Sequence, residues 1–460
     1  MDTKKLRQKI LDLAIRGKLV PQDPNDEPAS VLLERIRAEK EQLIKEGKIK
    51  CSKKSAATDK SHYENVPFEI PENWVWCKLD NLAFYKKGPF GSSLTKSMFI
   101  PDNGDAYKVY EQKNAIQKDS NLGHYFISDE KFQELKGFEV LPNDIIVSCA
   151  GTIGETYIMP SDFRSGIINQ ALMIIRLHNI DITPFYLLYF DFILKNEAGK
   201  DGKGTAIKNI PPFDILKNYW IPLPPLAEQD RIIKEVALWQ RFIDSIDGDI
   251  EDIFKLSKKT KSKILDLAIS GKLVSQDPND EPAIELLKRI NPDFKPCDNS
   301  HYENLPENWE EIAMGEICKL YDGEKVSGPS LTYIDVKHLR GSKVGEFVTS
   351  GKYVPQGSTL ILVDGENSGE VFTTPIDGYQ GSTFKILGIT EYFDKEHVLL
   401  LIKRSQKLLR ENKVGSAIPH LNKKMFKELI VPVPPLAEQK RIVATVNMLF
   451  YQLDMITAEL

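Results

Sequence analysis

The most regular hydrophobic pattern of the chain lies in the middle of the sequence and recurs at its C-terminus. Between residues 232 and 253, apolar side chains recur at spacings that alternate between four and three positions. This period is typical of a coiled-coil seam rather than of a general amphipathic stripe. Pro224 and Pro225 suit the start of a helix, and Gly271 suits its end. The pattern predicts one helix over about 226–270, which would be about 65 Å long.

The same register continues in the C-terminal and N-terminal segments of the chain. Two such helices, paired antiparallel, would bury their seams on each other. The predicted seam consists of Ile232, Val236, Trp239, Ile243, Ile246, Ile250, Ile253, Ile442, Val446, Leu449, Leu453, Ile456, Leu6, Ile10 and Leu13.

The sequence also repeats itself in several short segments. ILDLAI-x-GKLV is followed by QDPNDEPA at the start of the chain and again in its second half, PPLAEQ occurs twice, and so does a segment that ends in PENW. The order of these pieces agrees between the two copies only if the C-terminus is read onward into the N-terminus. The chain is therefore predicted to be a two-unit pseudo-dimer with circular pseudo-two-fold symmetry. The copies lie at 10–29 and 264–283, at 224–229 and 434–439, and at 71–74 and 306–309.

Two regions rich in Gly and Pro, with short apolar runs typical of strands, lie between the helical segments. Examples are DIIVSCAG at 144–151 and STLILVDG at 358–365. The predicted fold class is α+β, with two strand-rich α/β domains separated by a long antiparallel two-helix coiled coil. The predicted divisions are an N-terminal helix that completes the second helical region (1–17), a turn, helix and basic linker (18–60), the first globular domain (61–221), the central helical region (222–290), the second globular domain (300–431) and a C-terminal helix (432–460).

Composition narrows the class of protein. The net charge is −5, the pI is about 5.9 and the mean hydropathy is −0.31, so composition by itself gives no support to nucleic-acid binding. No apolar run is long enough to span a membrane, and the N-terminus does not read as a secretory signal. The cysteines are widely spaced, which predicts neither disulfides nor zinc and fits a reducing cytoplasm. They are Cys51, Cys77, Cys149, Cys297 and Cys318.

Several catalytic patterns are present only in part, and we expect no catalytic or metal-binding residue in the chain. IPPF at 210–213 has Ile210 where an amino methyltransferase needs a polar residue. Asp102, Glu111 and Lys113 match a nuclease pattern that often arises by chance. No Walker A sequence and no His-x-x-x-His pair occur.

The whole layout resembles the specificity subunit of type I restriction–modification enzymes. The residues that carry the resemblance are the two PPLAEQ segments that open heptad helices, the repeated ILDLAI-x-GKLV-x-QDPNDEPA and the closing Gly-[Thr/Ser]-Ala-Ile frames at 204–207 and 415–418. The resemblance implies that each globular domain is a target recognition domain that reads half of a split, asymmetric site on double-stranded DNA. It implies that the helices fix the gap and dock two modification subunits, with restriction subunits added.

By the same resemblance, S-adenosylmethionine, ATP and Mg²⁺ belong to the partner subunits, which methylate adenine at N6 and cleave DNA, and this chain needs no cofactor. The alternatives are the specificity subunit of another multisubunit restriction class, or a coiled-coil protein scaffold without DNA binding.

Residues that read bases cannot be carried over by motif, so the candidates are chosen by their chemistry. Gln and Asn side chains can pair with adenine, and Arg and Lys with guanine. The DNA-binding candidates are Lys86, Lys87, Ser92, Ser93, Lys108, Gln112, Lys113 and Asn114 in the first domain, and Lys337, His338, Arg340, Lys343 and Asn367 in the second.

Overall fold

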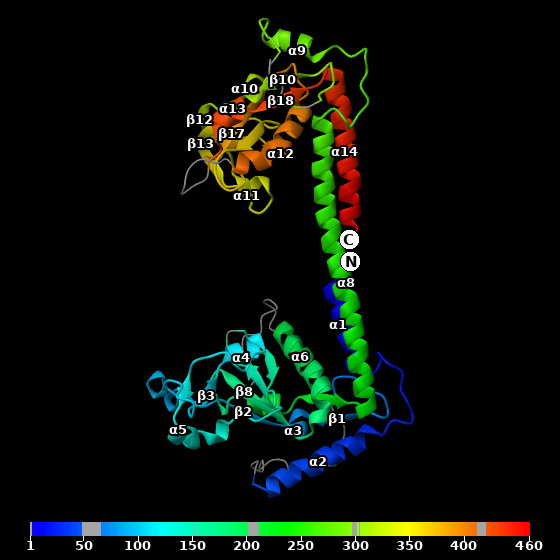
Figure 1. The fold of residues 1–460 in the computed structure, drawn as a ribbon, viewed down its shortest axis with the longest axis vertical. Helices are drawn as coiled ribbons and strands as arrows, with labels where there is room; N and C mark the ends of the chain where they lie inside the picture. The colour runs from blue at the N-terminus through cyan, green and yellow to red at the C-terminus, as the bar shows by residue number, and fades with distance from the viewer. Residues whose placement is uncertain are drawn as a thin grey trace. The chain divides into compact units, whose positions relative to one another are not determined.

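The computed structural model describes residues 2–47, 66–150, 152–200, 210, 212–296, 301–302, 304–411 and 420–460. The chain divides into two compact units, residues 2–247 and 248–460, which we call the first and the second unit. The boundary lies inside the helix α8 (Leu226–Ile269), which is 44 residues long (Figure 1). This helix confirms the prediction of one long central helix. No helix among the described residues is long and apolar enough to cross a membrane.

The first unit contains a four-stranded antiparallel sheet, a three-stranded sheet and a two-stranded ribbon. In the three-stranded sheet, β3 and β7 run parallel. The sheet with the order β2-β8-β5-β6 consists of β2 (Ala83–Lys87), β8 (Leu172–Leu177), β5 (Ile145–Ser148) and β6 (Thr156–Ile158); the sheet β4-β3-β7 consists of β4 (Phe126–Ile127), β3 (Tyr107–Tyr110) and β7 (Gly166–Ile168); and the ribbon pairs β1 (Val75–Lys78) with β9 (Trp220–Leu223). The helices are α1 (Thr3–Ile15), α2 (Ala29–Lys45), α3 (Leu79–Leu82), α4 (Gln112–Gln117), α5 (Asp129–Glu134), α6 (Thr183–Lys200) and α7 (Phe213–Leu216).

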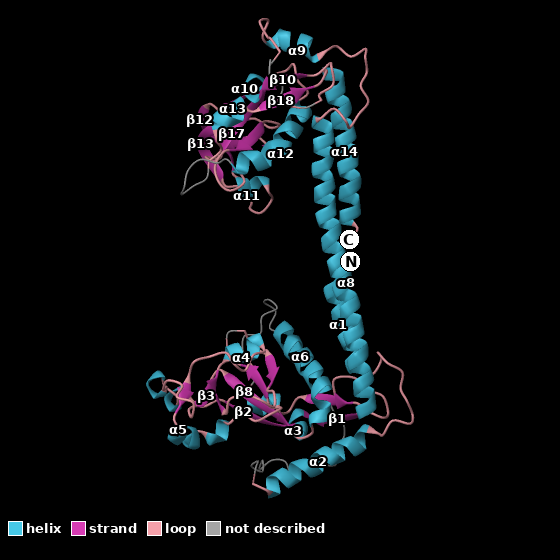
Figure 2. Cartoon of the chain, viewed as in Figure 1, coloured by secondary structure: helices cyan, strands magenta, loops and turns pink. Residues whose placement is uncertain are grey.

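The second unit repeats the order of the strands, although the described residues between β13 and β14 form no helix corresponding to α5. Figure 2 shows strands and helices in both units. Strand β12 of the second unit is longer than its counterpart β3 in the first unit. Strands β12, β13 and β16 close into a small barrel in which β12 and β16 run parallel. The sheet β11-β17-β14-β15 consists of β11 (Cys318–Tyr321), β17 (Phe384–Ile389), β14 (Thr359–Leu362) and β15 (Val371–Thr373); the barrel of β12 (Lys325–Ile334), β13 (Phe347–Val354) and β16 (Gly378–Gln380); and the ribbon of β10 (Glu310–Ala313) and β18 (Ile430–Val433). The helices are α9 (Ala283–Ile290), α10 (Met314–Ile317), α11 (Val336–Leu339), α12 (Lys395–Glu411), α13 (Lys423–Glu428) and α14 (Leu436–Ala458).

Strands β5 and β14 consist mostly of consecutive apolar residues because both faces of their sheets are covered. In β5, Ile145 and Val147 join the core that includes α6, whereas Ile146 joins a separate core with Tyr110 and Ile168. A strand that is buried on both faces reads as a continuous apolar run. This arrangement explains why DIIVSCAG has no alternation of polar and apolar residues, and β14 in the second unit follows the same rule.

Within each unit, α8 pairs with a second helix. In the first unit α1 packs on the early part of α8, and Arg7 bonds Asp244 at 2.7 Å and Asp247 at 2.8 Å. In the second unit α14 packs on the later part of α8, and Lys261 pairs with Asp454. Thr3 contacts Asp247, and Gln22, after the end of α1, bonds Glu228 near the start of α8, so α1 runs antiparallel to α8.

The predicted seam is unevenly buried. The residues buried in it are Ile10, Ile232, Val236, Ile243, Ile442 and Val446. Leu6, Leu13, Ile246, Ile250, Ile253, Leu449 and Leu453 are half-buried. Trp239 and Ile456 are 38% and 54% exposed, although Trp239 lies between the buried Val236 and Ile243. The heptad period thus identifies the helix better than it identifies each buried position.

One contact brings together the three repeated segments of the sequence. Glu228, in PPLAEQ, is 1% exposed and accepts bonds from Trp74 Nε1 at 2.9 Å and Gln22 Nε2 at 2.6 Å. Arg231, on the next turn, pairs with Asp26 at 2.5 Å. We call these five residues the first clamp. It fixes α8 to the turn after α1 and to the segment before β1.

The second unit contains the same contact, which we call the second clamp. Glu438 accepts from Trp309 Nε1 at 3.0 Å and from Gln276 Nε2 at 2.7 Å. Arg441 pairs with Asp280 at 2.6 Å. Burial raises the pKa of both Glu228 and Glu438, although the hydrogen bonds from the Trp and Gln side chains oppose that shift. The sequence repeats are therefore the residues of a duplicated, buried polar contact.

Position 17, beside the first clamp, accommodates only glycine without strain. Its φ is +66°, and a Cβ there would lie 2.5 Å from Cγ of Pro71. Gly271 in the second unit has φ +68° and the same relation to Pro306. Gly47 also has a positive φ, +72°, but a Cβ there would meet no described atom within 4 Å.

We therefore expect Gly17→Ala to lower the free energy of unfolding by about 2–4 kcal/mol, the sum of the left-handed backbone cost and the collision with Pro71. Gly47→Ala is the matched control and should lose only the backbone part, about 1–2 kcal/mol. Urea unfolding of the two full-length variants measures both values. Equal losses would mean that the approach of Pro71 contributes nothing.

Candidate nucleic-acid interface

In the first unit, the loops at one end of the central strands are tied together by backbone hydrogen bonds. Gly88 N donates to Leu172 O at 3.0 Å, Asn169 N to Tyr110 O at 2.9 Å, and Cys149 N to Ala171 O at 2.7 Å. These bonds hold the ends of β2, β3 and β5 against the turn between β7 and β8. We call this region the first loop cluster; it comprises residues 87–93, 111–114, 149–150, 152–154 and 169–171.

Most of the predicted DNA-binding residues of the first domain lie in or beside this cluster. Lys87 and Ser92 are exposed, whereas Ser93 and Gln112 are half-buried. Lys113 pairs with Glu111 at 2.9 Å. Lys86 lies at the end of β2 and places its ammonium 4.4 Å from the ring centroid of Phe138. The predicted residues lie within 28 positions of one another in the sequence. The structure places most of them at one end of a sheet.

Two of the predicted residues, Lys108 and Asn114, are buried in the fold, which speaks against their contacting DNA. Lys108 is 4% exposed, and its Nζ donates to Ser120 O at 2.7 Å. Asn114 is fully buried; it accepts from Glu111 N and donates to Asp119 O and Leu122 O. Both side chains satisfy backbone groups of the fold and leave no exposed polar atom for DNA. Burial also lowers the pKa of Lys108.

The second unit has a corresponding cluster at the same end of the corresponding strands. Val363 N donates to Thr383 O at 2.9 Å, Gly381 N to Ile334 O at 3.0 Å, and Gly323 N to Gln380 Oε1 at 3.0 Å. We call it the second loop cluster; it comprises residues 322–324, 335–346, 364–370 and 381–383.

All five predicted residues of the second domain lie in this second loop cluster. Lys337 is exposed, while His338 and Asn367 are half-buried. Arg340 pairs with Glu370, which joins α11 to the loop before β15, and Lys343 pairs with Glu346. Arg340 and Lys343 are therefore paired with carboxylates at or beside the same cluster.

The two loop clusters differ in charge at the ends of the equivalent strands β2 and β11. β2 ends in Lys86 and Lys87, whereas β11 is followed by Asp322, which pairs with Lys385 at 2.5 Å and Lys352 at 2.9 Å. Burial would raise the pKa of Asp322, but the hydrogen bonds from the two lysines and from Gln380 outweigh it and hold the pKa well below its usual range. Equivalent frames thus present different surfaces.

Sequence reasoning missed two residues of the first loop cluster. Phe90 is 85% exposed, and Gln170 is an exposed amide at the turn between β7 and β8. Selecting only polar and charged residues excluded Phe90. The available signal was its position between glycines in Gly-Pro-Phe-Gly, since such a sequence is typical of a tight turn.

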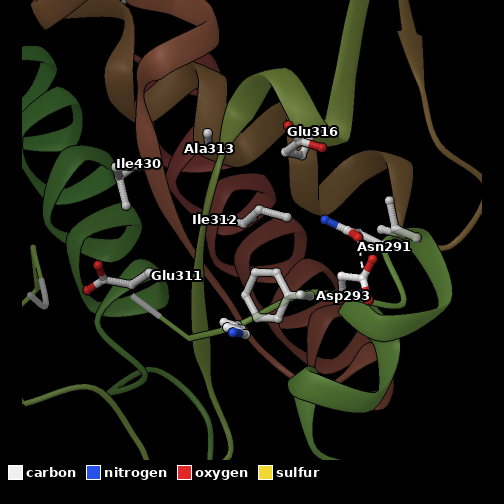
Figure 3. A pocket seen from close by; sticks show the side chains of 10 residues that line it. Asn291, Asp293, Glu311, Ile312, Ala313, Glu316 and Ile430 are labelled. Atoms are coloured by element: carbon white, nitrogen blue, oxygen red, sulfur yellow. Dashed lines mark hydrogen bonds between the residues drawn. The ribbon is translucent and has the colours of Figure 1, made fainter. Parts of the chain in front are cut away.

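A cavity of about 320 Å³ lies in the second unit, between the end of α9 and β10 (Figure 3). Glu311, at one side of it, accepts from the backbone N of His301 at 2.9 Å and of Tyr302 at 2.9 Å. Asn291 and Asp293 lie at the other side, and Asn291 accepts from Asp293 N at 3.1 Å. Among the described residues, no group of three or more His, Cys, Asp or Glu side chains could hold a metal ion. The Ile210–Phe213 motif falls partly outside the described residues.

Comparison with known proteins identifies the family. A family model described as "Type I restriction modification DNA specificity domain" matches residues 71–251 and 306–460. The chain belongs to the specificity subunits of type I restriction–modification systems. It is a DNA-binding, non-catalytic component of such a system.

Two relatives of this specificity subunit come from Escherichia coli. It is 31% identical to the EcoAI specificity subunit over 436 residues, which cover 79% of this chain and 70% of that protein. It is 30% identical to the EcoEI specificity subunit over 385 residues, or 69% of this chain and 62% of that protein.

A solved structure from a study of "complex assembly" and "conformational transition of the type I R-M system" covers 85% of this chain and 94% of its own. Its TM-score is 0.51 at 17% identity, which supports the fold alone.

The contrast between Lys87 and Lys108 can be tested on DNA binding by this specificity subunit. We expect Lys87→Ala to weaken binding and to reduce the slope of log affinity against log salt by about 0.9, as the loss of one phosphate contact does. Its free energy of unfolding should not change, because the side chain is exposed. Binding is measured by fluorescence anisotropy at several salt concentrations, with the cognate modification subunit present.

Lys108→Met is the control for the same measurement. It leaves the buried Ser120 carbonyl without its lysine donor and should lower the free energy of unfolding by about 1–3 kcal/mol. The salt slope should stay as in the wild type. A reduced slope for Lys108→Met, or an unchanged slope for Lys87→Ala, would contradict the assignment of these two lysines.

Proposed function

We propose that the two units each read one half of a split, asymmetric DNA target, the first through the first loop cluster and the second through the second. The observation that carries this proposal is a repeated frame with different loops: both units have the same strand order and the same clamp, yet the clusters differ in length and charge. Two different readers suit an asymmetric bipartite site, as identical readers in homodimers suit palindromes.

The residues proposed to contact DNA are those that the structure leaves at the clusters. Arg and Lys suit guanine or phosphate, while Gln and Asn suit adenine. In the first unit they are Lys86, Lys87, Ser92, Ser93, Gln112 and Lys113. In the second they are Lys337, His338, Arg340, Lys343 and Asn367.

The long helix would set the gap between the two half-sites. α8 begins in the first unit and ends in the second, and each of its ends is fixed to a clamp or to a helix of its unit. A helix has a fixed rise per residue, so its length specifies a distance. We propose the domain divisions of the sequence analysis on the same basis, with target recognition domains at 61–221 and 300–431.

We further propose that two modification subunits dock on repeated helical faces. On α8, Leu238 and Phe242 are 37% and 55% exposed; on α14, Met448 and Tyr451 are 54% and 66% exposed. Leu238 and Met448 occupy the same position after their PPLAEQ segments, and each partner residue lies three or four positions further along. Exposed apolar side chains grouped on one helix face mark protein-binding surfaces.

The partners would supply the chemistry. Modification subunits would hold S-adenosylmethionine and methylate adenine at N6, and restriction subunits would use ATP and Mg²⁺. The net charge of −5 predicts weak nonspecific DNA binding by the chain alone, because nonspecific affinity comes from the neutralisation of DNA phosphates by Lys and Arg. We therefore propose that DNA is bound in a complex completed by partner subunits, in the cytoplasm.

Genome-wide methylation mapping tests the proposed function. In cells that carry the cognate modification subunit, we expect a split adenine-methylated motif that disappears when this gene is deleted. The map gives both half-sites and the gap. Unchanged methylation, with a modification subunit shown to be active, would contradict the proposal and favour a coiled-coil scaffold. A nearby gene for a fused nuclease and methylase would instead indicate another multisubunit restriction class.

The stoichiometry of the complex tests the docking faces. We expect Phe242→Asp or Tyr451→Asp each to reduce the complex from two modification subunits to one, and the double variant to bind none, because a charge in an apolar contact costs about 2 kcal/mol or more. Native mass spectrometry counts the subunits.

Phe254→Asp is the matched control, since Phe254 is 50% exposed on α8 but lies about 120° around the helix from Phe242. Loss of a subunit in this control would show that the docking face is wrongly placed.

A further inference from the structure

Phe90 is the most exposed aromatic side chain among the described residues, at 85%. It follows β2 and precedes a short 3₁₀ helix, Gly91–Ser93, so it lies within the first loop cluster. Lys87 and Ser92 on the same loop are exposed, and Gln170 across the turn is exposed as well. The ring is therefore an exposed apolar group in a loop cluster that also exposes a lysine, a serine and a glutamine.

The loop that carries Phe90 is tightly built. A Cβ on Gly88 would lie 1.8 Å from Asn169 O, and a Cβ on Gly91 would lie 2.6 Å from Gln170 Oε1. Pro89 is buried, and Ser93 N donates to Phe90 O at 2.8 Å. Phe90 is thus flanked by Gly88, which packs against the backbone of Asn169, and by Gly91, which packs against the side chain of Gln170, so its exposure belongs to a closely packed loop.

The chemistry around Phe90 points to an apolar feature within a negatively charged surface. A basic and amide-bearing rim suits DNA, and the base edges of the major groove carry one apolar group, the 5-methyl of thymine. Phe is among the side chains that contact this methyl, and it has no hydrogen-bonding atom with which to read the other edges.

We propose that Phe90 is a specificity-determining residue that contacts the 5-methyl group of a thymine in the half-site read by the first unit. The inference rests on the proposed function and adds one base-reading contact to it. The second unit has no equivalent, because only Asp322, Gly323 and Glu324 connect β11 to β12. The contact therefore belongs to one half-site.

Replacement of thymine by deoxyuridine tests the contact directly, because it removes the methyl group and keeps the base pair. The full chain, in complex with its modification subunits, is titrated with duplexes that carry the mapped target and a deoxyuridine at each thymine in turn. For the wild type, we expect one position in one half-site to lose about fourfold in affinity, the contribution of one buried methyl group.

The variant Phe90→Ala should bind the unmodified target more weakly and should show no further loss at that same deoxyuridine. Phe90→Leu, which keeps an apolar side chain, should retain part of the effect. Phe347→Ala is the matched control: Phe347 is 71% exposed on β13 of the second unit, and its removal should leave the deoxyuridine effect intact.

The outcomes separate this inference from the proposed function. If the wild-type complex shows no preference for the mapped target, the proposed function fails. If it does prefer the target but Phe90→Ala loses the same factor on every deoxyuridine duplex as the wild type, the thymine contact is overturned. A deoxyuridine effect that Phe347→Ala removes instead would also overturn it.

Discussion

The architecture depends on a buried carboxylate at the start of each long helical segment. Glu228 and Glu438 are each nearly inaccessible, and each accepts hydrogen bonds from an indole and an amide. A buried charge that loses a donor pays its desolvation cost without compensation, so every member of the contact is needed. In each unit the indole lies in the segment before β1 or β10, and the amide lies in the turn after α1 or α8. One carboxylate therefore joins its own helix to two other parts of the chain.

This fixed frame allows the loop clusters to differ without disturbing the fold. In both units the turn before the central strand is held by backbone hydrogen bonds, such as Asn169 N to Tyr110 O and Gly381 N to Ile334 O, which do not involve side-chain atoms. Loops on a rigid scaffold tolerate changes in length and sequence. The long loop after Gly88 in the first unit and the three-residue connection at Asp322 in the second link equivalent strands, so the same strand arrangement accepts loops of very different length.

The sequence predicted the frame better than the surface, for physical reasons. Heptad spacing predicts the long helix, because burial of a seam dictates the period. The repeated motifs predict the duplication of the units. The identity of a lysine does not report its burial: Lys87 and Lys108 look alike in the sequence, yet Lys108 lies within β3 and caps the carbonyl of Ser120. Trp239 follows the heptad period and is nevertheless partly exposed, and the exposure of Phe90 depends on turn packing, which neither period nor residue type specifies.

Under the proposed function, the ion pairs within the loop clusters would allow an acidic chain to discriminate between DNA sequences. Arg340 is held by Glu370 and Lys113 by Glu111, so these cations are positioned before DNA arrives and are neutralised by their own fold. Exchanging an exposed ion pair for a base or phosphate costs little, about 0.2–1 kcal/mol. A matching base edge offsets that cost, whereas a mismatched site leaves the carboxylate facing the phosphate backbone. Under the proposed function, pre-paired cations would therefore weaken nonspecific attraction to DNA more than they weaken recognition of the correct sequence.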